Sequence, residues 1–257
     1  MNGATPPRRI AVVGGGITGV ASALFLQNDG HSVTLFEPDE FGTGTSMGNA
    51  GVISLASCIP TAMPGIPARV PKMLLDPYGP LSIRWGYLPK LTPWLLAFLR
   101  NCTKDRARGN ALAKSALLDR AYAAYETLIT MSDAGSLVNR RGMMKVYETE
   151  ADFEAVSFEL ELLQLTGRRY DVVSGDEIQH LEPGLAPIFA KGLFFDDNSG
   201  IVNPGRLVAR FAESYVANGG TVTKERVTDF AGHGPYIVSC DAGTYEADSI
   251  VLAAGSW

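Results

Sequence analysis

A turn containing Gly14, Gly16 and Gly19 constrains the fold of this chain more than any other feature. The spacing is GxGxxG, in which the first glycine permits a tight turn, the second lets a phosphate approach the backbone, and the third lets a helix pack closely on a strand. The four apolar residues before the turn, 10–13, predict a buried parallel strand. Glycines in a turn are weak evidence alone, so the segments that follow decide their meaning.

Those segments complete a βαβ unit. Residues 17–28 predict a helix, and residues 32–37 predict a second strand. Glu37 ends that strand, where its carboxylate would accept hydrogen bonds from the hydroxyls of an adenosine ribose and would repel a 2′-phosphate. The helix would direct its free N–H groups, from Ile17 and Thr18 onward, at a pyrophosphate. We therefore predict a dinucleotide site, for FAD or NAD rather than NADP.

The loop after the acid favours FAD. Residues 45–51 (TSMGNAG) offer the hydroxyls of Thr45 and Ser46, the amide of Asn49 and flexible glycine positions. Such a loop is able to wrap a pyrophosphate and an isoalloxazine that remain bound during turnover. The alternative is an ordinary surface loop, because the same residue types are common in loops.

Composition excludes several classes of function. The chain has 22 basic and 27 acidic residues, so it lacks the basic surface that nucleic-acid binding requires. Its three cysteines are far apart and match neither a disulfide framework nor a zinc site, which favours a reducing compartment. The polar leader before the first strand lacks the apolar core of a signal peptide. We therefore expect a cytoplasmic protein without a metal.

The remaining pattern predicts four more helical regions and several strands. Residues 105–135 predict a helix that buries Leu117, Ala121, Ala124, Leu128 and Met131. Residues 41–93 are rich in glycine, proline and serine, and we expect them to be irregular and to wrap a ligand. The other expected helices cover 149–167, 176–181 and 203–219, and the other expected strands cover 142–147, 193–195, 221–223, 227–230, 236–240 and 249–253.

This order predicts an α/β protein with a Rossmann-like FAD-binding domain. Residues 1–55 and 196–257 would form that domain from both ends of the chain, and 56–195 would be inserted as a substrate domain. One stretch of the insertion, 81–100, is rich in tryptophan and leucine, but charges and prolines interrupt it too often for a membrane span. Aromatic packing inside the substrate domain is the favoured interpretation, and contact with a membrane interface is the alternative.

Longer runs of sequence resemble a known family. They are IAVVGGGITGVASALFLQNDGHSVTLFE, TSMGNAGVIS, PGIPARVPKMLLDPYGPLSIRW, GLFFDDNSGIVNP and IVLAAGSW. In these runs the chain closely resembles the bacterial D-amino acid dehydrogenases, which belong with D-amino acid oxidase, glycine oxidase and sarcosine oxidase among the FAD-dependent oxidoreductases. The resemblance covers nearly the whole chain. It also implies that the inserted domain is an antiparallel sheet with helices.

The resemblance implies a reaction as well. A D-amino acid would transfer hydride from its α-carbon to flavin N5, and the resulting imino acid would hydrolyse to a 2-oxo acid and ammonia. Electrons would pass to a quinone or another acceptor, which would place the protein in the cytoplasm or peripherally on the cytoplasmic face of the inner membrane. The alternatives are a D-hydroxyproline or sarcosine/glycine-type dehydrogenase or oxidase, and a non-catalytic FAD-binding fragment.

Cofactor-binding positions follow from matching the family's motifs to this sequence. The glycine turn and its acid would hold the ADP half of FAD, the loop after the acid would lie beside the pyrophosphate and flavin, Val227 would pair with adenine, and the last strand would end in a second glycine contact. The positions are Gly14, Gly15, Gly16, Ile17, Thr18, Gly19, Glu37, Thr45, Ser46, Asn49, Ala50, Gly51, Val227, Ala254 and Gly255.

The substrate side is less well defined. Met143 and Tyr147 lie on the strand that lines the substrate side in relatives, whereas Arg69, Arg84 and Lys90 are weak candidates for binding an anion. Relatives continue beyond the position that matches Trp257, and their carboxylate-binding arginine lies there. We therefore expect this sequence to be an amino-terminal part of a longer protein, and we assign no catalytic residue.

Overall fold

The computed structural model describes residues 6–75 and 84–255, and the chain divides into two compact units. The first unit comprises Met1–Ile53, Ala123–Asn139 and Ser199–Trp257, and the second comprises Ser54–Tyr122 and Arg140–Asn198. Residues 123–139 belong to the first unit, whereas the predicted inserted domain ran without a break from 56 to 195.

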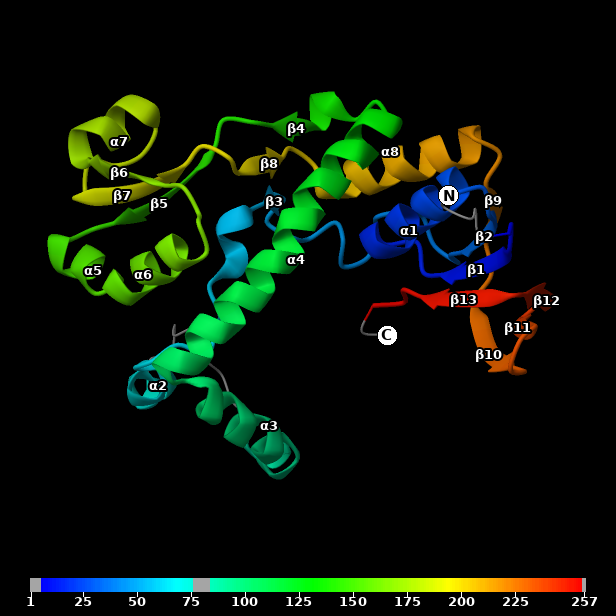
Figure 1. Ribbon diagram of the computed structural model, residues 1–257, viewed down its shortest axis with the longest axis horizontal. Coiled ribbons are helices and arrows are strands. Elements are labelled where there is room, and N and C mark those ends of the chain that lie inside the picture. The colour runs from blue at the N-terminus through cyan, green and yellow to red at the C-terminus, as the bar shows by residue number, and fades with distance from the viewer. Residues whose placement is uncertain (1–5, 76–83, 256–257) are drawn as a thin grey trace. The chain divides into compact units, whose positions relative to one another are not determined.

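A parallel sheet forms the centre of the first unit. Its strands are β1 (Arg9–Val13), β2 (Ser32–Phe36), β9 (Thr221–Thr223) and β13 (Ser249–Leu252), in the order β13-β1-β2-β9 (Figure 1). All neighbouring pairs run parallel. Strands from the two ends of the chain therefore lie side by side, and their carboxyl ends meet at one edge, where α/β proteins bind nucleotides.

Alternate residues of β1 are buried on opposite faces of this sheet. Ile10 and Val12 face a core formed with α1 (Ile17–Asn28) and α8 (Pro204–Ala217). Ala11 and Val13 face a second core, formed with an antiparallel sheet of β10 (Val227–Ala231), β11 (Tyr236–Cys240) and β12 (Gly243–Ala247). The sheet is thus covered on both faces, as a parallel sheet requires. The predicted Rossmann-like α/β class is confirmed.

Tyr215 on α8 connects the helical layer to the sheet. Its side chain is fully buried, and the single hydrogen of its hydroxyl is shared between the carbonyl oxygens of Val33 (2.6 Å) and Thr221 (3.0 Å). Burial raises the pKa of Tyr215 to about 12, because the phenolate would lose its hydration. The neutral form is therefore part of the folded structure.

Substituting Tyr215→Phe is expected to lower the free energy of unfolding by about 1–2 kcal/mol at pH 8, because the buried carbonyl oxygens of Val33 and Thr221 lose the donor that they share. The raised pKa also means that the unfolded tyrosine ionises near its ordinary value of about 10 while the folded one stays neutral, so stability falls between pH 10 and pH 12. At pH 11 the difference between wild type and variant should shrink by about 1.4 kcal/mol. Urea unfolding at both pH values tests this, with the exposed Tyr87→Phe as control. Equal pH slopes for wild type and variant would contradict it.

The second unit contains a three-stranded antiparallel sheet with helices. Strands β5 (Met143–Tyr147), β7 (Lys191–Phe195) and β6 (Asp171–Ser174) lie in the order β5-β7-β6. The region predicted as one helix from 149 to 167 is two helices, α5 (Glu150–Glu154) and α6 (Ser157–Leu165), with α7 (Gly175–Leu181) following β6. The expected cap is present, since Thr149 accepts a hydrogen bond from the Asp152 N–H.

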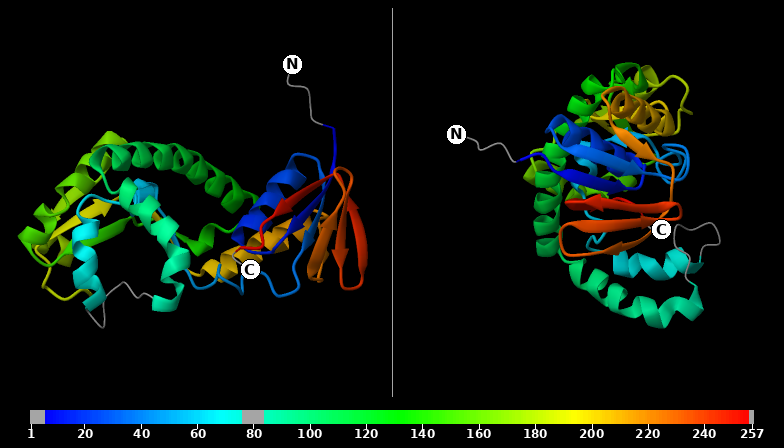
Figure 2. Two further views of the ribbon diagram at one scale, coloured as in Figure 1. Left: turned by 90° about the horizontal axis from the view of Figure 1, so that it is seen from below. Right: turned by 90° about the vertical axis from the view of Figure 1, so that its right-hand side faces the viewer.

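The expectation that residues 41–93 are irregular was wrong in part. They include α2 (Ile66–Leu75), the start of α3 (Leu88–Asn101), and short 3₁₀ turns at Leu55–Cys58 and Trp85–Tyr87. Helix α3 begins with Pro89 in its first turn, where no N–H is needed, and it accommodates Pro93 inside. Figure 2 shows α2 and α3 from two further directions.

Helix α4 (Lys104–Met131) confirms the predicted helical region but corrects its buried face. Leu128 is buried as expected, whereas Leu117 is 73% exposed. The first half of the helix instead buries Ala107, Ala111 and Ser115, which are spaced four residues apart. The spacing of large apolar residues predicted the wrong buried face, because small residues make the packing contacts in this half of the helix. The short strands β3 (Val52–Ile53), β4 (Val138–Asn139) and β8 (Ser199–Ile201) form a small sheet in the first unit.

Candidate functional site

The glycine turn joins β1 to α1 and requires glycine at its first position. Gly14 has φ +109°, and a Cβ there would lie 2.4 Å from the carbonyl oxygen of Ala253, at the end of β13. The Gly14 N–H donates to the Phe36 carbonyl oxygen at 2.9 Å. The turn is therefore confined between the ends of two neighbouring strands, and only glycine has both the conformation and the size.

Two further glycines of the motif differ in their surroundings. A Cβ on Gly19 would lie 1.7 Å from the Gly14 carbonyl oxygen, so this glycine allows α1 to approach the turn. A Cβ on Gly16 would meet only the Ser46 hydroxyl, at 3.2 Å. The space beside Gly16 is otherwise open, as expected for a position where a ligand approaches the backbone.

Glu37 lies across the turn. One of its carboxylate oxygens accepts a hydrogen bond from the Gly15 N–H (2.6 Å) and the other from the Asp39 N–H (3.0 Å). A Cβ on Gly15 would lie 2.6 Å from Cγ of Glu37, so the middle glycine makes room for this side chain. Each oxygen retains capacity to accept from a ribose hydroxyl, because a carboxylate offers about four acceptor positions.

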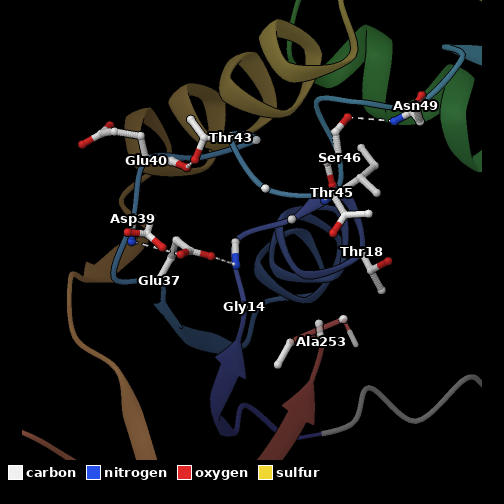
Figure 3. Close-up of a pocket in the computed structure, with 17 residues that line it drawn as sticks. Gly14, Thr18, Glu37, Asp39, Glu40, Thr43, Thr45, Ser46, Asn49 and Ala253 are labelled. Carbon is white, nitrogen blue, oxygen red and sulfur yellow. Dashed lines mark hydrogen bonds between the residues drawn. The ribbon is translucent and has the colours of Figure 1, made fainter. Parts of the chain in front are cut away.

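The loop after the acid is attached to the amino terminus of α1. The Ser46 hydroxyl accepts from the Ile17 N–H (3.0 Å), the Asn49 side-chain amide donates to the Ser46 carbonyl oxygen (2.7 Å), and the Asn49 side-chain oxygen accepts from the Gly51 N–H (2.7 Å). Figure 3 shows Thr45, Ser46 and Asn49 on this loop, beside the start of α1. Side-chain hydrogen bonds therefore order a loop that has little regular structure.

The variant Ser46→Ala should lower the free energy of unfolding by about 1 kcal/mol, because a first-turn N–H of α1 loses its acceptor. Thr45→Ala removes a hydroxyl from the same loop and serves as the matched control, with a smaller expected change. Thermal and urea denaturation of the protein without added cofactor measure both effects. Equal stabilities of the two variants would contradict the proposed cap.

These elements enclose a cavity of about 510 Å³, which lies within the usual range for small-molecule and cofactor sites. It includes eleven of the predicted cofactor positions: Gly14, Gly15, Gly16, Ile17, Thr18, Glu37, Thr45, Ser46, Asn49, Ala254 and Gly255. Four predicted positions do not line it. Gly19 packs behind the turn, Val227 packs against the core beneath the sheet, and Ala50 and Gly51 come after the lining part of the loop.

Six lining residues were missed by the sequence-based prediction: Asp39, Glu40, Gly42, Thr43, Gly44 and Ala253. Most of them follow Glu37 directly, at the edge where the parallel strands end. Their position after β2 was the available signal, since loops at this edge bind the ligand in such folds. Figure 3 shows Asp39, Glu40 and Thr43 along one side of the cavity and Ala253 on another.

Charge differs between the two ends of the cavity. Glu37, Asp39 and Glu40 are gathered at one end, where Glu40 also pairs with Lys224. Figure 3 shows Thr18, in the first turn of α1, on the other side of the glycine turn, where the N–H groups and dipole of the helix start attract anions. A dinucleotide fits with its ribose hydroxyls near the carboxylates and its phosphates near the helix. The donor and acceptor groups of this cavity thus suit the ADP part of FAD.

The two predicted substrate residues lie in the second unit. Tyr147 is 8% exposed and packs with Leu163, Leu193 and Phe195 in a hydrophobic core, and Met143 packs against the same core. Burial raises the pKa of the Tyr147 hydroxyl. Both side chains thus help to hold β5 against its neighbours, and their role toward a substrate stays a prediction.

Among the described residues, no group of three or more His, Cys, Asp or Glu side chains is placed to bind a metal ion. The exposed Arg69, Arg84 and Lys90 lie in the second unit as well.

Comparison with known proteins shows which family the chain belongs to. The family model described as "FAD dependent oxidoreductase" matches residues 9–257. A D-amino-acid oxidase of Bradyrhizobium diazoefficiens is 34% identical over 97% of this chain and 60% of its own length. A D-amino acid dehydrogenase of Vibrio vulnificus is 29% identical over 97% of this chain and 61% of its own length. The chain therefore spans about 60% of the length of these relatives.

Solved structures show the same fold. Glycine oxidase from Geobacillus kaustophilus aligns with a TM-score of 0.63 at 20% identity, over 98% of this chain and 56% of the other. L-amino acid deaminase from Proteus vulgaris aligns with a TM-score of 0.67 at 16% identity, over all of this chain and 50% of the other. At these identities the likeness concerns the fold alone.

Proposed function

Because the chain belongs to the FAD-dependent oxidoreductase family, we propose that it holds FAD in the cavity at the glycine turn and that the whole protein oxidises D-amino acids to imino acids. The observation that carries the cofactor site is the arrangement of the turn, Glu37 and the Ser46 loop around one cavity. The names of the related D-amino-acid oxidase and D-amino acid dehydrogenase support the choice of substrate.

The chain's own residues have distinct roles in this proposal. Glu37 accepts hydrogen bonds from the adenosine ribose, Gly16 lets the pyrophosphate approach the backbone, and Ile17 and Thr18 present the helix amino terminus to its charge. Ser46 holds the loop beside the phosphates. Bound flavin would supply the hydride acceptor for the substrate α-carbon, after which the imino acid hydrolyses in water to a 2-oxo acid and ammonia.

Val227, Ala50 and Gly51 remain proposed contacts nearer the adenine and flavin ends, and Met143 and Tyr147 remain proposed contacts of the substrate. We propose that the cofactor domain comprises residues 1–55 and 196–257 together with 123–139, which belong to the same compact unit, and that the rest of 56–195 is the substrate domain.

We propose a quinone or another carrier as the electron acceptor. Transfer to a quinone would bring the protein to the cytoplasmic face of the inner membrane as a peripheral protein. No helix in the described part of the chain is long and apolar enough to span a bilayer.

The test uses protein expressed from the complete reading frame. We expect a yellow protein with the absorbance of bound flavin, and reduction of a dye acceptor with D-alanine. D-hydroxyproline and sarcosine serve as competing substrates, and turnover of either one in place of D-alanine would support the alternative amine chemistry. Bound flavin with no turnover of any of the three would contradict the proposed substrates. A colourless protein that takes up no added FAD would contradict the cofactor site.

A further inference from the structure

Helix α3 is apolar but has no buried residue. It carries seven large apolar side chains, and each remains at least partly accessible: Leu88, Leu91, Trp94, Leu95, Leu96, Phe98 and Leu99. None of the hydrophobic clusters formed by the described residues includes one of them. An amphipathic helix in a globular protein ordinarily buries its apolar stripe, so the exposed face of α3 indicates a contact outside the unit.

The apolar side chains share one face of the helix. At 100° per residue they fall within an arc of about 200°, with Lys90, Arg100 and Asn101 on the opposite side. Trp94 is 59% exposed and stacks on Phe98 with ring centroids 5.3 Å apart. Just before the helix, Trp85 is 71% exposed and Tyr87 is 55% exposed. The accessible surface here is therefore rich in aromatic side chains.

Charge in this segment is opposite to that of the whole chain. Residues 66–104 contain six basic residues and a single acidic one, Asp76, whereas the complete chain has a net charge of −5. Arg84, Lys90 and Arg100 are exposed, and no ion pair joins them to another residue in the described ranges. A basic segment of an acidic protein is attracted to a negatively charged surface.

We propose that α3, together with Trp85 and Tyr87, lies in the interface of an anionic lipid bilayer. Tryptophan and tyrosine prefer the headgroup region, and a basic amphipathic helix lies parallel to the membrane with its apolar face inserted. The helix has 14 residues, too few for the roughly 20 that a span requires. This inference rests on the proposed peripheral membrane contact but on neither FAD binding nor turnover.

The test measures binding of protein expressed from the complete reading frame to vesicles by co-flotation. We expect binding to vesicles of phosphatidylcholine mixed with phosphatidylglycerol and much weaker binding to phosphatidylcholine alone. Residues 1–257 contain three tryptophans, Trp85, Trp94 and Trp257, so changing every tryptophan of the protein except Trp85 and Trp94 to phenylalanine leaves only the two reporters in the proposed surface. Their emission should shift to shorter wavelength on binding and be quenched by lipids brominated near the headgroup.

Two sets of variants separate the contributions. Arg84→Gln, Lys90→Gln and Arg100→Gln together should weaken binding to the anionic vesicles on the order of 100-fold, since each basic residue near such a surface contributes about fivefold. The matched control removes three exposed arginines elsewhere, Arg120, Arg141 and Arg226, and should change binding much less.

Trp85→Ser with Trp94→Ser should abolish insertion. The exposed pair Leu117→Ser and Ile188→Ser is its control.

Each contrary outcome is distinct. Equal binding to neutral and anionic vesicles, or equal losses in test and control variants, would overturn the proposal. So would a stable dimer in which the emission of Trp85 and Trp94 is already shifted and lipid changes nothing, because the face would then bind a second copy. Circular dichroism of every variant checks folding. Flavin content is measured on the same samples, so a failure of lipid binding is distinguishable from a failure of the FAD site.

Discussion

Replacing Gly19 by alanine is expected to lower the free energy of unfolding by about 3 kcal/mol or more and to abolish retention of FAD. The added Cβ would lie 1.7 Å from the Gly14 carbonyl oxygen, and Cβ of Ala253 would be 3.5 Å away. Backbone atoms surround the position, so no side-chain rotation relieves the overlap. Helix α1 must move away from the turn, and its amino terminus then no longer faces the cavity.

The matched control is Gly109→Ala in α4, where an added Cβ meets nothing within 4 Å. That variant should stabilise the protein by about 1 kcal/mol, because alanine is the better helix former. Urea denaturation gives both changes, and flavin absorbance after gel filtration gives the cofactor content. If Gly19→Ala had the stability of the wild type, α1 could not lie so close to the Gly14 carbonyl oxygen that an added Cβ overlaps it.

Glu37→Gln should weaken FAD binding by roughly 30- to 150-fold, which corresponds to about 2–3 kcal/mol. The carboxylate accepts from the N–H groups of Gly15 and Asp39 with its two oxygens. Glutamine has the same shape but a single acceptor oxygen, so its NH₂ group must face one of these N–H donors. The turn loses a hydrogen bond, and the ribose hydroxyls lose a charged acceptor.

Glu40→Gln is the control, since Glu40 lines the same cavity but is 75% exposed in its ion pair with Lys224. An exposed ion pair contributes little, so this variant should bind FAD within a few-fold of wild type. Fluorescence titration of the cofactor-free protein with FAD measures both affinities. Equal losses in the two variants would mean that general charge, and not the position of Glu37, determines affinity.

The βαβ unit could be predicted from the sequence because its determinants are local. Each glycine of the turn, the strand before it and the helix after it lie within thirty residues, and α1 has the predicted bounds. Asn203 before α8 illustrates the same point, since its side chain accepts from the Arg206 N–H as an N-cap does. Short-range hydrogen bonds and capping positions can be predicted from a single sequence.

Features that depend on distant contacts could not be predicted in the same way. Pro89 and Pro93 favoured an irregular segment, yet the first lies in the initial turn of α3 and the second is tolerated within it. The side chain of Leu117 is exposed although its spacing predicted burial, because packing on α4 uses small residues there. The cavity is also lined by Asp39, Glu40 and Thr43, because they follow the end of β2. Their residue types alone do not predict a cofactor site.

The pairing of β1 with β13 has a consequence for biosynthesis. Ile10 pairs with Ser249, and the Ala253 carbonyl oxygen closes one side of the Gly14 turn. The ribosome releases β1 long before β13 is made. The edge of β1 that pairs with β13 therefore stays unpaired while most of the chain is translated. Cofactor capture at this turn is therefore a late event, and a nascent chain arrested before residue 253 presents an open strand edge to chaperones instead of a finished nucleotide site.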